Sequence, residues 1–245
     1  MVRGSRIKDQ DTNNATFQSS VIFKPKQSIM KSTTTLLMLM ILLTSHSLSA
    51  QTTIGLTAGA SFANVTVKSQ GISASPKTKA GITIGFFADA PLSANFSFQP
   101  ALNFVQKGYN VKDDAVTEKV TMNYFEVPLN FIYNTKRNEG LFIGAGPSIS
   151  YGISGTDKLV YSGTGMPDDN EKIKFGSGGD EVKAFDFGAN AVAGYKFKGG
   201  FMISGNYTLG LTRINNDDGS GNDGSIKNKC FAIKIGYVFH SIEHK

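Results

Sequence analysis

The chain has very little cysteine and histidine, and both shortages exclude classes of protein. Its single cysteine, Cys230, cannot form a disulfide within the chain. Of its three histidines, only His240 and His244 lie beyond residue 50, and both follow the last apolar segment. Hydrolytic sites of the Ser–His or Asp–His kind use a histidine as general base. The sequence therefore argues against a protease or a lipase, and Cys230 is predicted to be a small buried filler.

The chain also lacks an apolar run long enough to cross a bilayer as a helix, which takes about 20 residues. Its longest apolar run is Leu36–Leu43. Lys31 and a short threonine run come before it, and Ser47-Leu48-Ser49-Ala50 comes after it. A basic start, a short apolar core and a small residue before the cut are the parts of a secretory signal peptide. We expect 1–29 to be a disordered extension upstream of the true start, 30–50 to be the signal peptide, and 51–245 to be one exported domain. A buried helix is the alternative for the apolar run.

Net positive charge is small once residues 1–50 are set aside. The full chain has 25 Lys and Arg against 19 Asp and Glu, a net charge of +6. Six of these basic residues and two of the acidic ones lie in 1–50, so 51–245 carries 19 against 17, or +2. Nucleic-acid binding needs clustered Lys and Arg. The sequence therefore predicts no nucleic-acid partner.

Residues 51–245 contain eight segments in which apolar and polar residues alternate. A period of two is typical of a β-strand whose two faces meet different surroundings. In Asn123–Tyr133, for example, one face carries Phe125 and Phe131 while the other carries Glu126 and Asn130. The eight predicted strands are Ile54–Val67, Ala80–Ala90, Phe96–Tyr109, Asn123–Tyr133, Leu141–Tyr151, Val182–Phe197, Phe201–Leu211 and Lys229–Phe239.

The connections between these segments alternate in length. Three are short, at 91–95, 134–140 and 198–200, and four are long and polar, at 68–79, 110–119, 152–181 and 212–228. Short turns at one end and long loops at the other are typical of outer-membrane barrels. The predicted fold is all-β, an eight-stranded antiparallel up-and-down transmembrane β-barrel. We expect it in a Gram-negative type of outer membrane, with both termini on the periplasmic, short-turn side.

The two faces of the predicted strands differ in chemistry. The face assigned outward is apolar and ends in aromatic residues at both barrel ends, as expected of girdles at the membrane interfaces. Those at the short-turn end are Phe96, Phe98, Phe131, Tyr133, Tyr195, Phe197, Phe201, Tyr237 and Phe239, and those at the other end are Phe62, Tyr151, Phe185 and Phe231. A soluble lipocalin-like barrel, which is the alternative fold, would place its apolar face inside. Outward faces this apolar would promote aggregation in water.

The face assigned inward is small and polar. An unpaired buried carboxylate is costly, so we expect Glu126 to be paired, with Lys107 and Lys234 as candidate partners. A barrel of eight strands is only wide enough for side chains to fill. This favours a structural cluster that fills the lumen over a polar conduit. Its predicted members are Gln99, Asn103, Lys107, Glu126, Asn130, Asp186, Asn190 and Lys234.

Two glycine-rich stretches invite a ligand-binding interpretation that their spacing does not support. In Asn215–Gly224, the sixth position counted from Asp218 is Asp223 and the twelfth is Lys229, where an EF-hand needs Gly and Glu. The Gly176–Gly179 stretch lacks the Lys-Ser/Thr of a phosphate-binding loop. We expect both stretches to be solvated loops, and we expect no metal site, cofactor or catalytic residue.

Three strand motifs in order resemble the PorT-like family of outer-membrane β-barrel proteins. Tyr124-Phe125-Glu126-Val127-Pro128-Leu129 is similar to its Y-L-E-I-P-L-L-L signature, Phe96–Leu102 with Gln106-Lys107-Gly108 to the preceding strand, and Leu141–Pro147 to the following one. The resemblance rests on Tyr124, Glu126, Pro128, Gln99, Gly146 and Pro147 and spans 51–239. It implies an eight-stranded barrel without known catalytic residues and with a mostly undefined function. The namesake branch assists protein secretion, but no residue here selects that branch. Asn130 is polar where the family usually has an aliphatic residue.

The expected function is therefore a non-enzymatic outer-membrane barrel with a structural or surface-interaction role through its long extracellular loops, above all 152–181 and 212–228. The alternatives are a narrow transport pore, a component of a protein secretion assembly, and the soluble binding barrel. The expected partners are outer-membrane lipid, the barrel-assembly machinery during biogenesis, and an extracellular or secretion-system protein.

Overall fold

The structure is a computed structural model that describes residues 52–69, 72–74, 76–113, 116–162, 167–176, 178, 181–216 and 224–239. The predicted extension at 1–29 and the signal peptide at 30–50 lie outside these residues. None of the described residues forms a helix with the length and apolarity that a membrane crossing requires.

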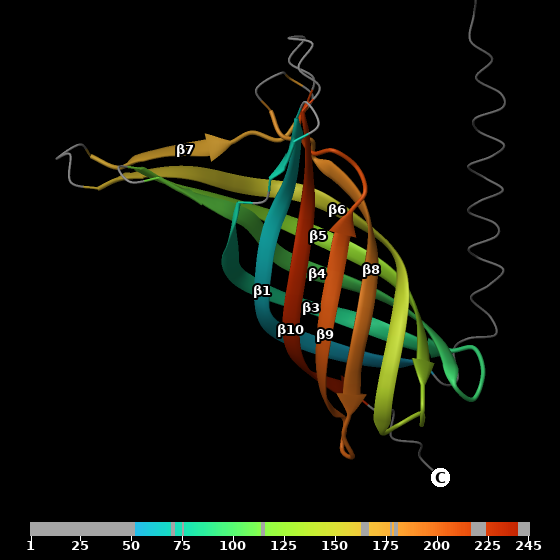
Figure 1. Cartoon of the computed structure of the whole chain (residues 1–245). Helices are drawn as coiled ribbons and strands as arrows, with labels where there is room; N and C mark the ends of the chain where they lie inside the picture. Colours follow the sequence, from blue (N-terminus) through green and yellow to red (C-terminus); the bar gives the residue numbers. More distant parts are fainter. Residues whose placement is uncertain are drawn as a thin grey trace, which may run out of the picture. The chain divides into compact units, whose positions relative to one another are not determined.

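Eight antiparallel strands form a closed ring (Figure 1), which confirms the predicted fold. They pair in the order β1, β3, β4, β5, β6, β8, β9 and β10, and β10 pairs back with β1 from Ile54–Phe239 to Lys68–Ser225. Two short strands, β2 and β7, extend β1 and β6 at one end. The strands are β1 Thr53–Ser69, β2 Ile72–Ala74, β3 Lys77–Pro91, β4 Phe96–Lys112, β5 Val116–Asn134, β6 Gly140–Tyr161, β7 Asp169–Ile173, β8 Phe185–Lys196, β9 Phe201–Gly210 and β10 Ser225–Phe239.

Several strands run further than the sequence predicts, so the prediction of a long loop at 110–119 is wrong. Strand β4 continues to Lys112 and β5 begins at Val116, where the Asp113 N–H donates to the Val116 carbonyl at 2.9 Å. Strand β6 also passes its predicted end and reaches Tyr161. In the β5 extension the apolar residues Val120 and Met122 point inward, while Lys119 and Thr121 lie on the other face. The outward apolar period of the membrane wall therefore stops before these extensions, although the strands continue.

The prediction is also wrong for 182–184, which precedes β8. The Val182 N–H donates to the Lys174 carbonyl and the Lys183 N–H to the Ile214 carbonyl, at 2.9 and 2.7 Å. These residues therefore pair with neighbouring connections at the long-loop end, which we define as the end that carries β2 and β7.

The outer wall is apolar along the membrane-spanning part of the ring. Large side chains such as Leu141, Phe201 and Ile235 are more than 60% exposed, and Ile235 reaches 68%. At the short-turn end the predicted aromatic residues touch one another, with ring centroids 5.2 Å apart for Phe96 and Tyr133. Such a wall is suited to lipid, with aromatic side chains at the interface.

The interior has apolar side chains at both ends, so the expectation of a uniformly small and polar inner face is wrong. The lower apolar cluster consists of Phe87, Ile132, Phe142, Val192, Met202 and Val238. The upper apolar cluster consists of Val120, Met122, Tyr124 and Ile214. Polar side chains fill the level between them, because a ring of eight strands leaves an interior that side chains occupy.

Candidate functional site

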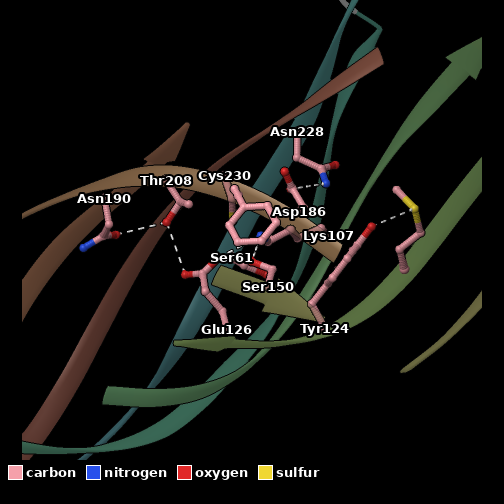
Figure 2. A network of polar contacts seen from close by, with 12 residues as sticks. Ser61, Lys107, Tyr124, Glu126, Ser150, Asp186, Asn190, Thr208, Asn228 and Cys230 are labelled. Carbon is pink, nitrogen blue, oxygen red and sulfur yellow. Dashed lines mark hydrogen bonds and ion pairs between the residues drawn. The ribbon is translucent and has the colours of Figure 1, made fainter. Parts of the chain in front are cut away.

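The centre of the inner polar network is an ion pair between neighbouring strands (Figure 2). Lys107 Nζ of β4 lies 2.7 Å from Glu126 Oε2 of β5, and the side chains are 1% and 6% exposed. Both side chains occupy inward positions of their strands, as the period of two predicts. The structure thus gives Glu126 a partner, and among the two candidates the partner is Lys107.

Hydroxyl groups from two further strands complete this centre. Lys107 Nζ donates to Ser150 Oγ at 3.0 Å, and Ser150 Oγ donates to Glu126 Oε2 at 3.3 Å. The Thr208 hydroxyl lies 3.2 Å from Glu126 Oε1 and 3.0 Å from Asn190 Oδ1. Strands β4, β5, β6 and β9 are therefore joined through one carboxylate (Figure 2).

Asparagine side chains add buried polar contacts from β8 and β10. Asn190 Nδ2 donates to Asn130 Oδ1 at 2.9 Å, and Asn228 Nδ2 donates to Asp186 Oδ2 at 2.8 Å. Asp186 Oδ1 also accepts from the Thr212 hydroxyl at 3.1 Å. Asn130, polar where the resembled family is usually aliphatic, therefore has a buried partner of its own.

A cavity of only about 30 Å³ lies beside this network, which is room for a water-sized molecule. Gln99, Asn103 and Lys234 line it. The structure thus brings Lys107, Glu126, Asn130 and Asn190 into one connected group and places these three beside it. All eight side chains of the predicted cluster are buried, at 2% to 6% exposure.

A second buried ion pair, which the sequence did not identify, lies towards the short turns. Lys196 Nζ lies 2.8 Å from Asp89 Oδ2 and donates to Asn134 Oδ1 at 3.0 Å. The sequence signal that could have identified this pair was a charged residue at an inward-facing position of β3 and another at an inward-facing position of β8. Because 107 residues separate Asp89 from Lys196, only the closed ring shows that they meet.

Cys230 packs inside the barrel against Ala63 and Val105 and is 5% exposed, as expected of a filler. In the described part of the chain, no three His, Cys, Asp or Glu side chains are placed to share a metal ion. Most of the Asn215–Gly224 stretch lies outside the described residues. At its start, Asn215 Nδ2 donates to the Gly224 carbonyl at 2.7 Å and so closes the base of this connection.

A larger cavity of about 380 Å³ opens at the long-loop end, above the upper apolar cluster, and we call it the mouth pocket. Sequence periodicity could not locate it, because β7 and the connection after β9 form part of its lining. Its apolar lining consists of Val120, Met122, Ile173, Val182, Ile214 and Ile226, and its polar lining of Tyr109, Asp157, Glu171, Lys172, Lys174 and Asn215.

Four carboxylates gather on β5, β6 and β7 outside the membrane-spanning part of the strands, and two of them, Asp157 and Glu171, line this pocket. Asp157 pairs directly with Glu171, and Glu118 and Asp169 both pair with Leu159, two residues further along β6. We call these four carboxylates the acidic wall. Burial, and then the neighbouring Glu171 and Asp169, raise the pKa of Asp157 above its ordinary value.

The next two groups on this wall are coupled in the same way. Burial, followed by the charge of Asp157, raises the pKa of Glu118. Burial, followed by the charge of Glu118, raises the pKa of Tyr109 to about 12. The Tyr109 hydroxyl lies 3.4 Å from Glu118 Oε1 and is its hydrogen-bond donor. The wall therefore concentrates negative charge beside apolar surface.

A closed antiparallel ring with an apolar outer wall and a buried polar interior defines a transmembrane β-barrel. The sequence matches the family described as "Outer membrane protein beta-barrel domain" over residues 47–216, and the chain belongs to that family.

Solved barrels resemble the chain at low sequence identity. Ail, the attachment invasion locus protein of Yersinia pestis, is 14% identical, with 77% of this chain and 99% of that chain covered and a TM-score of 0.42. Neisserial surface protein A is 12% identical, with 76% of this chain and 97% of that chain covered and a TM-score of 0.39. The outer membrane protease OmpT from Escherichia coli is 10% identical, with 78% of this chain and 97% of that chain covered and a TM-score of 0.32. A comparison with curated protein sequences found no significant match.

Proposed function

We propose that this outer-membrane barrel is a non-enzymatic surface-interaction protein, with its long-loop end facing the outside of a Gram-negative type of cell and its termini in the periplasm. The observation that supports this proposal is the filled interior. Two buried ion pairs and two apolar clusters occupy the inside of the ring, and the cavity at their level holds about 30 Å³. What remains available for binding is the long-loop end.

The orientation is tested by thiol labelling of intact cells. Cys230 is the chain's only cysteine, so a Cys230→Ser background is free of thiols. In that background Asn170→Cys places a thiol on exposed β7, and Asn138→Cys places one in the exposed short turn between β5 and β6. A maleimide that does not cross membranes should label Asn170→Cys in intact cells and Asn138→Cys only after permeabilisation. The reverse pattern would refute the proposed orientation.

The transport alternative is separated by conductance. A barrel filled by ion pairs should give no stable single-channel current in planar bilayers. The matched variant is Glu126→Ala with Lys107→Ala, which removes the central pair, and current in that variant alone would show that the side chains block the lumen. Steady current through the unaltered protein would replace the interaction role with a narrow pore.

A second candidate is a role in a protein secretion assembly, which is the role of the namesake branch of the family that the strand motifs resemble. The three motifs, around Gln99, Glu126 and Gly146, support this finer family assignment. Crosslinking from the Asn170→Cys and Asn138→Cys positions in cells tests it. Capture of secretion components from Asn138→Cys, together with loss of secretion in a deletion strain, is the result that this candidate requires.

A further inference from the structure

The carboxylates of the acidic wall share one face of the paired strands β5, β6 and β7. Strand alternation sends the nearby lysines to the opposite face: Lys119 pairs with Lys158 in register, and Lys158 forms its ion pair with Asp168 at 2.9 Å. Like charges that face each other across a strand pair are destabilising. Asp157 and Glu171 are such a pair, and the fold retains them.

One oxygen of this wall is buried and has no partner. Asp157 Oδ1 is enclosed, and among the described residues no hydrogen-bond donor reaches it. A buried acceptor without a donor costs about 1–3 kcal/mol, and more when it is charged. Asp157 lines the mouth pocket, so a cation that enters the pocket lies beside this carboxylate and favours its charged form.

The remainder of the pocket determines what kind of donor fits. Its floor is the apolar surface of the upper cluster, with Val120, Met122 and Ile214, and its volume of about 380 Å³ suits a small organic molecule. Lys172 and Lys174 also line the rim, but both residues are exposed, and strand alternation places Lys172 on the face opposite Glu171.

We propose that the mouth pocket binds a small organic cation with an apolar body. Its ammonium group lies against Asp157 and Glu171, and its apolar body lies on Val120, Met122 and Ile214. This inference rests on the proposed function only in that the pocket faces the outside of the cell. It names the chemical class of ligand that a surface-interaction barrel of this sequence takes.

The test uses the full exported chain in lipid nanodiscs and three probes that share a benzyl group and have similar size: phenethylammonium, 2-phenylethanol and phenylacetate. Calorimetry should show saturable binding of the ammonium, with the alcohol about 10-fold or more weaker because it lacks the charge. Phenylacetate should not bind. Equal binding of the alcohol, or preferred binding of phenylacetate at Lys172 and Lys174, overturns the proposal.

Two isosteric variants locate the site. Asp157→Asn should weaken phenethylammonium binding about 10-fold or more, since it removes the charge of a charge-assisted hydrogen bond. Asp168→Asn is the matched control, because Asp168 is a carboxylate at the same end that pairs with Lys158 outside the wall. Binding in the Asp168→Asn variant should stay within about twofold of the unaltered protein. Equal losses in both variants refute the site.

Folding of each variant is checked by its heat-dependent shift on electrophoresis and by two-dimensional NMR, which also reports whether Met122 and Ile214 methyl signals move on titration. Binding in nanodiscs combined with failed labelling of Asn170→Cys in intact cells would overturn the orientation and leave the pocket standing. Successful labelling of Asn170→Cys in intact cells without any binding in nanodiscs would overturn the pocket and leave the orientation standing.

Discussion

Glu126→Ala should destabilise the barrel far more than removal of an ordinary surface carboxylate. The substitution removes the ion pair with Lys107 at 2.7 Å and the acceptor of the Ser150 and Thr208 hydroxyls. It leaves the Lys107 ammonium in a position where its side chain is 1% exposed. Breaking a buried pair from one side typically costs about 3–5 kcal/mol, because the remaining charge is uncompensated.

The structure indicates where in that range the cost should fall. Lys107 keeps a hydrogen bond to Ser150 at 3.0 Å, and its Nζ lies 5.0 Å from the Tyr124 ring centroid, a favourable distance for a cation–π contact. Because these contacts remain, the expected loss of stability lies in the lower half of that range, at about 3–4 kcal/mol. Removing both charges in a Glu126→Ala, Lys107→Met protein should cost clearly less than the sum of the single changes, with a coupling of about 1–3 kcal/mol.

The assay is reversible urea unfolding in detergent micelles at neutral pH, followed by far-ultraviolet circular dichroism because the chain has no tryptophan. Glu139→Ala is the matched control. Its partners Lys136 and Lys198 lie 3.2 and 3.8 Å away and are 71% and 88% exposed, so loss of the Glu139 carboxylate should cost about 0–1 kcal/mol. A Glu126→Ala protein that is no less stable than Glu139→Ala, or strictly additive single and double variants, would refute the reasoning.

Three further outcomes are expected. Because the raised pKa values of Glu118 and Asp157 make the folded state bind protons more readily than the unfolded chain, stability of the β5–β6–β7 extension should rise as the pH falls from neutral towards the ordinary carboxyl pKa. Hydrogen exchange corrected for intrinsic rates measures this, and Asp157→Asn should remove most of the pH effect. Gly108→Ala should cost over about 1 kcal/mol by urea unfolding, because its φ of 141° is positive and its Cβ would overlap the Val120 carbonyl. Gly199→Ala, at φ 89° in open space, should cost less. Finally, the protein should stay in the membrane fraction in alkaline carbonate, and release there would contradict a spanning barrel.

The sequence by itself determined which way each residue of the ring faces. In β5, Phe125 points outward and Glu126 inward because successive side chains of a strand lie on opposite faces, and one such period identifies both walls. The short connections at 91–95, 134–140 and 198–200 indicated the antiparallel pairing of the strands that they join. These are local properties of the chain, so they could be predicted without knowing which strands meet.

Only the tertiary structure decided which inward residues touch. Glu126 had two candidate partners, and the register between β4 and β5, with Asn103 opposite Glu126, brings Lys107 within 2.7 Å. Asp89 and Lys196 meet across 107 residues only because the ring closes. The mouth pocket was hidden for another reason: its lining combines Val120 and Met122 of β5 with residues of β7 and of the connection after β9, and only the folded chain brings these segments together. Closure and register, which depend on all eight strands at once, therefore determine the sites, whereas the local pattern determines the wall.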